Sequence, residues 1–190
     1  MPTFEINEII PASAEAVFAL VHDYRRRLEW DTLLREAYLE PAFDEAKKGA
    51  ISVCRGRLIL GGFALRTQYI SFEKGKVAAV KLLNQPPFFD SFAASIRHVG
   101  IEANSSEVIY KVNFTVKPRL LRPILNPLMR FVLKWETCKR LKALKKFFQS
   151  NEDSAEFTGK VLNDLEDNKK PTLKRSAVHL IFSGCIFFLC

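Results

Sequence analysis

Acid–base catalysis is the chemistry that this sequence could best support, and His98 is its main candidate. His98 has the same parity as Phe92 and Ile96 in an extended run, so we expect its imidazole to point with them into the interior. An imidazole titrates near neutral pH and could exchange a proton with a substrate, with Tyr110 or Arg66 as its partner. The alternative is a structural histidine that is hydrogen-bonded to a neighbouring strand or to Tyr110.

Other chemistries lack a signature in the sequence. His22, His98 and His179 fall in an expected helix, strand and C-terminal segment, and no cysteine or acidic pair has the spacing of metal ligands. We therefore expect no metal and no cofactor, and we assign no catalytic residue. The four cysteines are widely spaced, and charge and strand pattern begin within the first eight residues. These features favour a cytoplasmic, reducing compartment and no signal peptide.

The positive charge of the chain is concentrated in one segment. The sequence has 190 residues, of which 48% are hydrophobic and 26% charged, which is typical of one well-buried domain. The net charge is +8, yet Lys117 to Lys146 alone contain ten basic residues and one acid, Glu136. Such a surface could contact an anionic membrane, nucleic acid or a partner protein, or only solvent. On the helix face that carries most of these basic residues, no aromatic residues alternate with them, which disfavours nucleic acid.

The first thirty residues predict a strand followed by two short helices. Residues 3–10 alternate apolar and polar side chains, and Pro11 ends the strand because it has no amide hydrogen to donate. Ser13 is a suitable N-cap for the next helix, with Glu15 in its first turn. A second short helix is predicted from Asp23, ending near Trp30.

Six further strands and one long helix complete the predicted order, β-α-α-β-β-β-β-β-β-α. Short turn segments separate the extended runs, so the sheet should be antiparallel. After Pro118 the apolar period becomes helical through Gln149. The predicted strands are residues 35–40, 50–60, 63–72, 77–83, 89–99 and 107–116. The predicted apolar stripe of the helix is Leu121, Leu125, Leu128, Val132, Trp135, Leu141, Leu144 and Phe148.

The stretch "IPASAEAVFALVHDYRRRLEWD" resembles the opening of the START-like superfamily, also called SRPBCC or the polyketide cyclase/dehydrase and lipid-transport group. The similarity extends over residues 1–149 and includes "FAASIRHVG" and the arginine-rich end of the long helix. The matching positions are Pro11, Ala12, Glu15, Val17, Phe18, Asp23, Tyr24, Trp30 and Asp31. The resemblance implies an α+β helix-grip fold with a cavity for a hydrophobic molecule.

A strongly curved sheet of about seven strands, closed by one helix, should leave an elongated and largely apolar cavity. Tyr69 and Tyr110 could orient a ligand there through their hydroxyls. Trp30 either borders the mouth of this cavity or packs in the core, and Asp31 is expected to cap a turn. The expected ligand-binding residues are Trp30, Tyr69, Phe92, Ile96, His98, Tyr110, Val112, Phe114, Leu125, Leu128, Val132 and Trp135.

The sequence after the expected domain (residues 1–149) divides into a polar linker, 150–176, and an apolar tail, 177–190. As a helix the tail would be about 21 Å long, short of the roughly 30 Å of a bilayer core. It could insert part-way into a membrane, which would make the protein peripherally attached. The alternatives are packing on the domain and a non-native end. The residues expected at the headgroups are Lys169, Lys170, Lys174 and Arg175.

Three functions follow from this interpretation. The first is binding and transport of a hydrophobic small molecule such as a lipid, a quinone or a polyketide-like compound. The second is a cyclase, aromatase or dehydratase, which ranks lower because the predicted interior has few ionisable groups. The third is a protein- or ribosome-interaction module that uses the basic helix.

Overall fold

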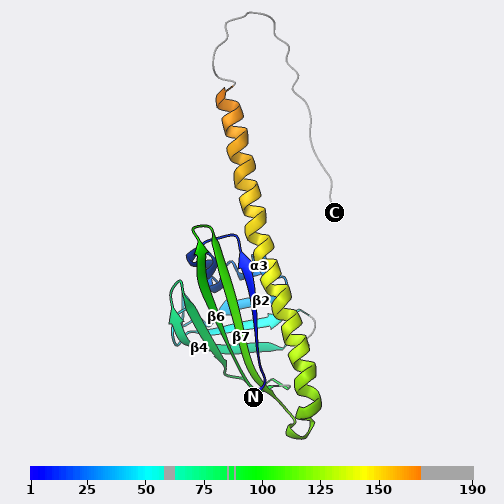
Figure 1. Cartoon of the computed structure of the whole chain (residues 1–190). Helices are drawn as coiled ribbons and strands as arrows, with labels where there is room; N and C mark the ends of the chain where they lie inside the picture. Colours follow the sequence, from blue (N-terminus) through cyan, green and yellow to red (C-terminus); the bar gives the residue numbers. More distant parts are fainter. Residues whose placement is uncertain (58–62, 85, 88, 168–190) are drawn as a thin grey trace, which may run out of the picture. The chain divides into compact units, whose positions relative to one another are not determined.

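The computed structural model describes residues 1–57, 63–84, 86–87 and 89–167, with side chains described up to Asn151. Its elements follow the predicted order (Figure 1). They are β1 (Thr3–Ile10), α1 (Ala14–His22), α2 (Arg27–Trp30), β2 (Leu34–Leu39), β3 (Ile51–Gly56), β4 (Ala64–Glu73), β5 (Val77–Leu82), β6 (Phe89–Glu102), β7 (Ser105–Val116), a 3₁₀ turn (Arg119–Leu121) and α3 (Arg122–Asp167).

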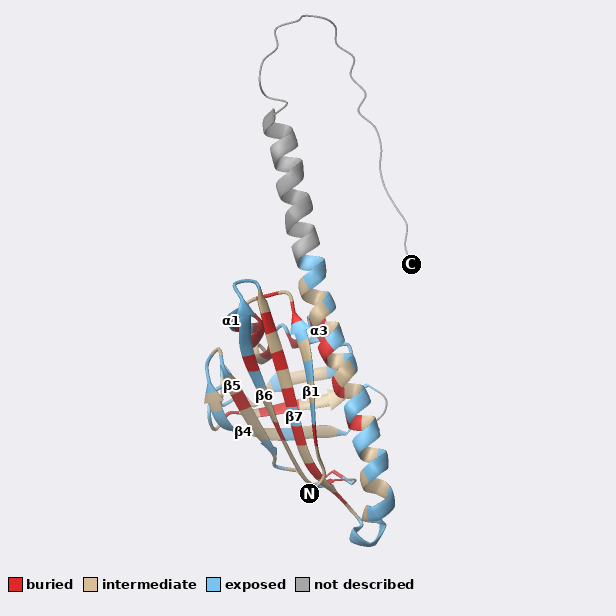
Figure 2. Ribbon diagram, in the orientation of Figure 1, coloured by how far each residue is buried: buried red, intermediate tan, exposed pale blue. Residues whose placement is uncertain are grey.

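One seven-stranded antiparallel sheet forms the body of the fold, with strand order β1-β7-β6-β5-β4-β3-β2. β7 shows why the sheet has one buried face. Val108, Tyr110, Val112, Phe114 and Val116 are buried and alternate with residues that are less buried, as the sequence predicted. Figure 2 shows this alternation as red bands along β7. The buried face packs against α3, so the predicted helix-grip fold is confirmed.

The two short helices close one end of the fold. Ser13 caps α1 by accepting a hydrogen bond from the amide of Ala16 at 3.3 Å. α2 begins at Arg27 and not at Asp23, because the Asp23 carboxylate accepts from the amide of Arg25 at 3.0 Å and holds a turn there. The turn brings α2 directly onto β2.

The inward face of α3 differs from the apolar stripe predicted for it. Leu133, Thr137, Leu141 and Leu144 are buried, at intervals of three or four residues. Leu121, Leu128 and Trp135 belong to the predicted stripe but are exposed, and Leu121 lies in the 3₁₀ turn before α3. The prediction followed apolar residues only, whereas the real inward face includes polar ones. The predicted stripe is therefore displaced by about one residue from the buried face in the first half of α3, and the prediction is correct at Leu141 and Leu144.

α3 also continues past Gln149, to Asp167. The beginning of the segment expected to be a linker is therefore helical. The chain divides into two compact units, Met1–Asp153 and Ser154–Cys190. The apolar tail, 177–190, lies outside the described residues. Within the part of the chain that is described, no helix has both the length and the apolar composition needed to cross a bilayer.

Candidate functional site

A cavity of about 140 Å³ lies between the sheet and α3. Its sheet side is mostly apolar, whereas its helix side and the end near α1 and α2 are polar. The apolar lining residues include Leu65, Val80, Phe92, Ile96, Val112 and Leu133. The polar ones include His22, Tyr24, Arg27, Ser52, Thr67, Tyr69, Tyr110, Glu136, Thr137 and Arg140. Apolar groups supply the larger part of the lining, as the sequence predicted, but the polar groups gathered at one side make the cavity amphiphilic.

The structure brings part of the predicted site together. Register explains which strand residues meet there: Ile96 pairs with Tyr110, and Ala94 pairs with Val112, so all four share the inward face. The predicted residues that line the cavity are Tyr69, Phe92, Ile96, Tyr110 and Val112. The predicted residues outside its lining are Trp30, His98, Phe114, Leu125, Leu128, Val132 and Trp135.

Core packing and helix rotation account for the residues that lie elsewhere. Trp30 is 3% exposed in the core, with the guanidinium of Arg27 at 4.5 Å from its ring centre. Phe114 is fully buried, with its ring 6.5 Å from that of Phe89. The remaining residues are on α3: Leu125 and Val132 are half-buried, and Leu128 and Trp135 face outward.

His98 points into the interior, as predicted, but beneath α1 and away from the cavity. Its ring lies edge-on to Phe18 at 5.2 Å, and neither ring nitrogen has a hydrogen-bond partner among the described residues. Burial lowers the pKa of His98 to about 4. Arg66 instead forms an ion pair with Glu40. The acid–base pair of His98 with Tyr110 or Arg66 is therefore not assembled, and neither is the structural hydrogen bond considered for His98.

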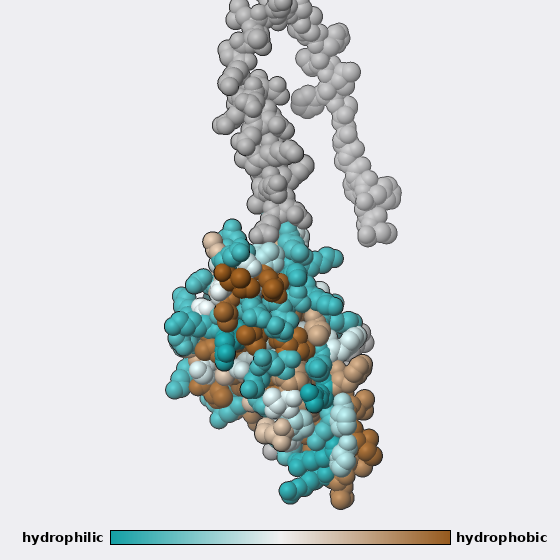
Figure 3. Space-filling model, in the orientation of Figure 1, coloured by the Kyte–Doolittle hydropathy of each residue, from teal (hydrophilic) through white to brown (hydrophobic). Residues whose placement is uncertain are grey.

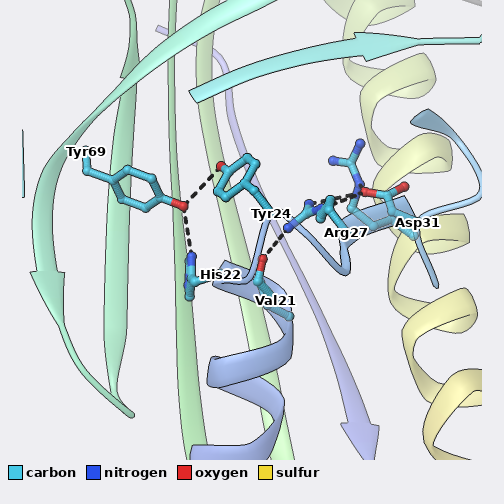
Figure 4. Close-up of polar contacts among 7 residues, drawn as sticks. Val21, His22, Tyr24, Arg27, Asp31 and Tyr69 are labelled. Carbon is cyan, nitrogen blue, oxygen red and sulfur yellow. Dashed lines mark hydrogen bonds and ion pairs between the residues drawn. The ribbon is translucent and has the colours of Figure 1, made fainter. Parts of the chain in front are cut away.

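A chain of three polar side chains forms one wall of the cavity; Tyr69 was predicted to lie there, whereas His22 and Tyr24 were not (Figure 4). Tyr69 Oη lies 2.9 Å from His22 Nδ1 and 3.1 Å from Tyr24 Oη. Burial lowers the pKa of His22, with His98 and Arg27 acting in the same direction, and burial raises the pKa of Tyr24 to about 12. All three groups are therefore neutral near pH 7.

His22 and Tyr24 also border a groove on the outside of the protein. The groove lies over α1 and the segment after β2, and its lining includes Phe18, Leu28, Tyr38, Leu39, Phe43 and Phe72. Because both side chains touch the groove and the cavity, the hydrogen-bonded chain forms a partition between the two spaces.

Two arginines share one carboxylate in the second polar cluster. Asp31 is fully buried, and its Oδ2 lies 3.2 Å from Arg27 Nε and 2.8 Å from Arg140 Nε. Arg27 also donates to the carbonyl of Val21 at 2.6 Å (Figure 4). Asp31 was expected to cap a turn; instead it joins α2 to α3. Arg140 belongs to the basic segment Lys117 to Lys146, for which the sequence suggested a charged surface, but it lies in the cavity wall.

The other polar groups of the cavity lining are not activated for catalysis. Ser52 Oγ and Thr67 Oγ1 are 2.8 Å apart across β3 and β4. Burial raises the pKa of the Cys54 thiol, which opposes formation of a nucleophilic thiolate. Burial also raises the pKa of Glu136, against the effect of Arg140 one turn later. For the charged residues of the cavity wall, the only signals in the sequence were two pairs of opposite charge four residues apart, Arg27–Asp31 and Glu136–Arg140.

Comparison with solved structures places this architecture among START-like proteins. A START superfamily protein from Mycobacterium smegmatis is 15% identical, with a TM-score of 0.63 over 78% of this chain and 97% of that one. XoxI from Bacillus cereus is 19% identical, with a TM-score of 0.62 over 80% and 99%. The Zhui aromatase/cyclase from Streptomyces sp. R1128 is 12% identical, with a TM-score of 0.64 over 78% and 93%.

A comparison with curated protein sequences finds no match. The family described as "Polyketide cyclase / dehydrase and lipid transport" matches residues 1–149, which contain the whole sheet, both short helices and the inward part of α3. The sequence signature, the helix-grip architecture and the enclosed cavity agree with this match. The chain therefore belongs to the polyketide cyclase/dehydrase and lipid transport family.

Proposed function

We propose that the protein binds a hydrophobic small molecule in the cavity between the sheet and α3 and carries it. The observation on which this proposal depends is the enclosed apolar wall formed by β4 to β7 beneath α3. Each square ångström of apolar ligand surface removed from water there contributes about 25 cal/mol, before the costs of association are subtracted. Family membership supports the same class of function.

The partition between groove and cavity suggests the route of exchange. A ligand that entered from the outer groove would have to separate the hydroxyls of Tyr24 and Tyr69, which are 3.1 Å apart. Neutral side chains can part without exposing a charge to the apolar interior. Entry would therefore involve movement of the segment between α1 and α2 and not of the sheet.

The binding function can be tested by filling the cavity. Toluene and benzyl alcohol, followed by ligand-observed NMR, should bind the wild-type protein saturably. Ala94→Leu places a larger side chain in the cavity lining and should weaken this binding at least tenfold. Ala93→Leu on the opposite face of β6 is the matched control and should leave binding unchanged. Native mass spectrometry of the purified protein should also show a bound small molecule.

Failure of both neutral probes to bind, together with an empty native mass spectrum, would contradict the proposal. Equal loss of binding in Ala94→Leu and Ala93→Leu would assign the effect to a general loss of structure. Thermal unfolding of both variants separates these outcomes, because a folded Ala94→Leu protein that no longer binds locates the site in the cavity.

A cyclase or aromatase is the second candidate, and one observation supports it more strongly than the sequence did. The cavity contains His22, Tyr69 and Arg140, so its interior is richer in ionisable groups than predicted. The size of the cavity argues against a cyclase or aromatase. A volume of about 140 Å³ is below the roughly 300–1,000 Å³ of most small-molecule pockets and leaves little room for a poly-carbonyl chain. We therefore rank binding first.

A membrane contact is a second part of the proposal, and the outer face of α3 supports it. Exposed apolar side chains recur there every three or four residues, with Ile124 and Phe131 each 70% exposed. We name this set the α3 outer stripe; its members are Ile124, Leu128, Phe131 and Trp135 on α3, with Leu120 in the 3₁₀ turn that precedes the helix. Figure 3 shows hydrophobic atoms on the outer side of the first turns of α3.

Basic residues flank the α3 outer stripe. Arg130, Lys134 and Lys139 are exposed beside it, and Lys139 Nζ lies 3.6 Å from the ring centre of Trp135. The single acid of the segment, Glu136, is turned toward the cavity. An apolar helical face flanked by cations suits an anionic bilayer, to which each well-placed lysine or arginine contributes about 1 kcal/mol.

Flotation with vesicles tests the membrane contact. The full chain should float with vesicles that contain phosphatidylserine at low salt and much less with phosphatidylcholine alone. Ile124→Ser with Phe131→Ser should reduce flotation severalfold, because the insertable apolar surface is lost. Ile70→Ser, at an exposed residue of β4, is the control and should not. Equal flotation on both vesicle types would contradict the electrostatic contribution, whereas a dimer that dissociates in the double variant would assign the stripe to protein contact.

A further inference from the structure

Arg140 has unused hydrogen-bonding capacity inside the cavity. Its Nε is held by Asp31 Oδ2 at 2.8 Å, and its side chain is 20% exposed. The contact at Nε is an ion pair without hydrogen-bond geometry, and among the described residues no hydrogen bond involves either of the two terminal Nη atoms. A guanidinium held at Nε presents these two nitrogens as a fixed fork, and such a fork matches the two oxygens of a carboxylate.

The other arginine of the cluster does not share this property. Arg27 Nε and Nη2 face Asp31 at 3.2 Å, its Nη1 donates to Val21, and its plane lies over Trp30. Arg27 is thus committed to the structure, which leaves Arg140 as the cation that can bind a ligand.

The charges of this cluster do not balance. Two guanidinium groups face one carboxylate, that of Asp31. Burial works against the charged form of Arg140, but Asp31 and then Tyr110 raise its pKa above the usual value, so it remains a cation. Arg140 shares its one ion-paired carboxylate with Arg27, and a mostly buried cation in this situation favours an anionic ligand.

Two further groups meet the same space. Tyr110 lines the cavity and interacts electrostatically with Arg140, so its side chain lies close to the same ligand space. Glu136 lines the cavity one turn before Arg140, without an ion pair to it within 4.0 Å. When ionised, Glu136 opposes an anionic ligand; when protonated, it can donate a hydrogen bond to one.

We propose that the ligand is a small amphiphilic monocarboxylic acid, with its carboxylate on the Nη atoms of Arg140 and its apolar body against Phe92, Ile96 and Val112. This inference rests on the proposed binding function and specifies its ligand class. The volume sets the size of the body. A cavity of about 140 Å³ is close to the roughly 150 Å³ of an engineered apolar cavity that admits benzene. The acid therefore carries one ring or a short alkyl chain.

Matched acids and amides test the inference. Isothermal titration calorimetry would compare cinnamate with cinnamamide, and octanoate with octanamide, at pH 7 and low salt. Each acid should bind the wild-type protein at least tenfold more tightly than its amide. Arg140→Met should abolish this preference while the amides bind as before. Lys139→Met removes the neighbouring, exposed cation and is the matched control; it should preserve the preference.

Glu136→Gln gives an independent measurement that keeps Arg140 in place. Removing the competing carboxylate should strengthen binding of both acids severalfold and leave the amides unchanged. If acids and amides bind the wild-type protein equally, the carboxylate inference is overturned while the binding function stands. If neither acids, amides nor toluene bind, the binding function itself fails. A preference that survives Arg140→Met would place the carboxylate elsewhere and also overturn the inference.

Discussion

Asp31→Asn should destabilise the protein by about 3–5 kcal/mol, the range observed when one partner of a buried ion pair is removed. Asp31 is the only carboxylate of the described chain that is paired with Arg27 and Arg140. The amide keeps the shape of the side chain but leaves two buried guanidinium groups without a counter-charge. Urea denaturation at pH 7 would measure the change in the free energy of unfolding.

Glu29→Gln is the control for Asp31→Asn. Glu29 of α2 forms an ion pair with Arg26, the residue before this helix, but both side chains are about half exposed, at 47% and 49%. Water screens such a pair, so its loss should cost less than about 1 kcal/mol. Similar small losses in both variants would show that the Arg27–Asp31–Arg140 cluster does not hold α2 to α3.

Leu144→Ala should destabilise the protein by about 2–5 kcal/mol, as truncation of a large buried side chain usually does. Leu144 is 1% exposed and belongs to the main core, which joins α3 to the sheet. Removing most of its side chain leaves a cavity that the sheet cannot fill. Thermal and chemical unfolding, both read by circular dichroism, would measure the loss.

Leu128→Ala separates the observed face of α3 from the face that the sequence predicted. Both leucines belong to the predicted apolar stripe, but Leu128 is 58% exposed. Its truncation should change the free energy of unfolding by less than about 0.5 kcal/mol, since it removes little buried surface. A loss at Leu128 as large as at Leu144 would mean that α3 packs through the predicted face.

The Arg27–Asp31–Arg140 cluster contributes to both stability and ligand binding, whereas the His22–Tyr69–Tyr24 chain is expected to open during ligand exchange. The Arg27–Asp31–Arg140 cluster joins α2 to α3 and at the same time presents Arg140 to the cavity. Because Asp31 contacts Arg140 at Nε and no hydrogen bond to a described residue involves the Nη atoms, the cluster can be structural and still leave the Nη atoms for a ligand. The His22–Tyr69–Tyr24 chain is neutral, so it can open at little electrostatic cost.

The sequence alone determined the order of the elements and the inward face of the strands. Alternation along β7 and the strand–Pro11–Ser13 start of α1 are local patterns, and each is set by side chains within a few residues of one another. For the same reason Phe92, Ile96, Tyr110 and Val112 could be assigned to the cavity: on a regular strand, parity decides the face.

Only the tertiary structure decided which face of α3 is buried and which charges meet. By sequence, Arg140 is one residue of a basic helical segment; in the structure, α2 places Asp31 next to it and the two form an ion pair. The sequence pattern favours burial of Trp135, but Glu136 and Thr137 occupy the inward positions of the helix, so Trp135 faces solvent. The burial of a charge depends on a partner distant in the chain, since only pairing offsets its loss of hydration. No local pattern contains that information, so the charged groups of the cavity lining could not be predicted from the sequence.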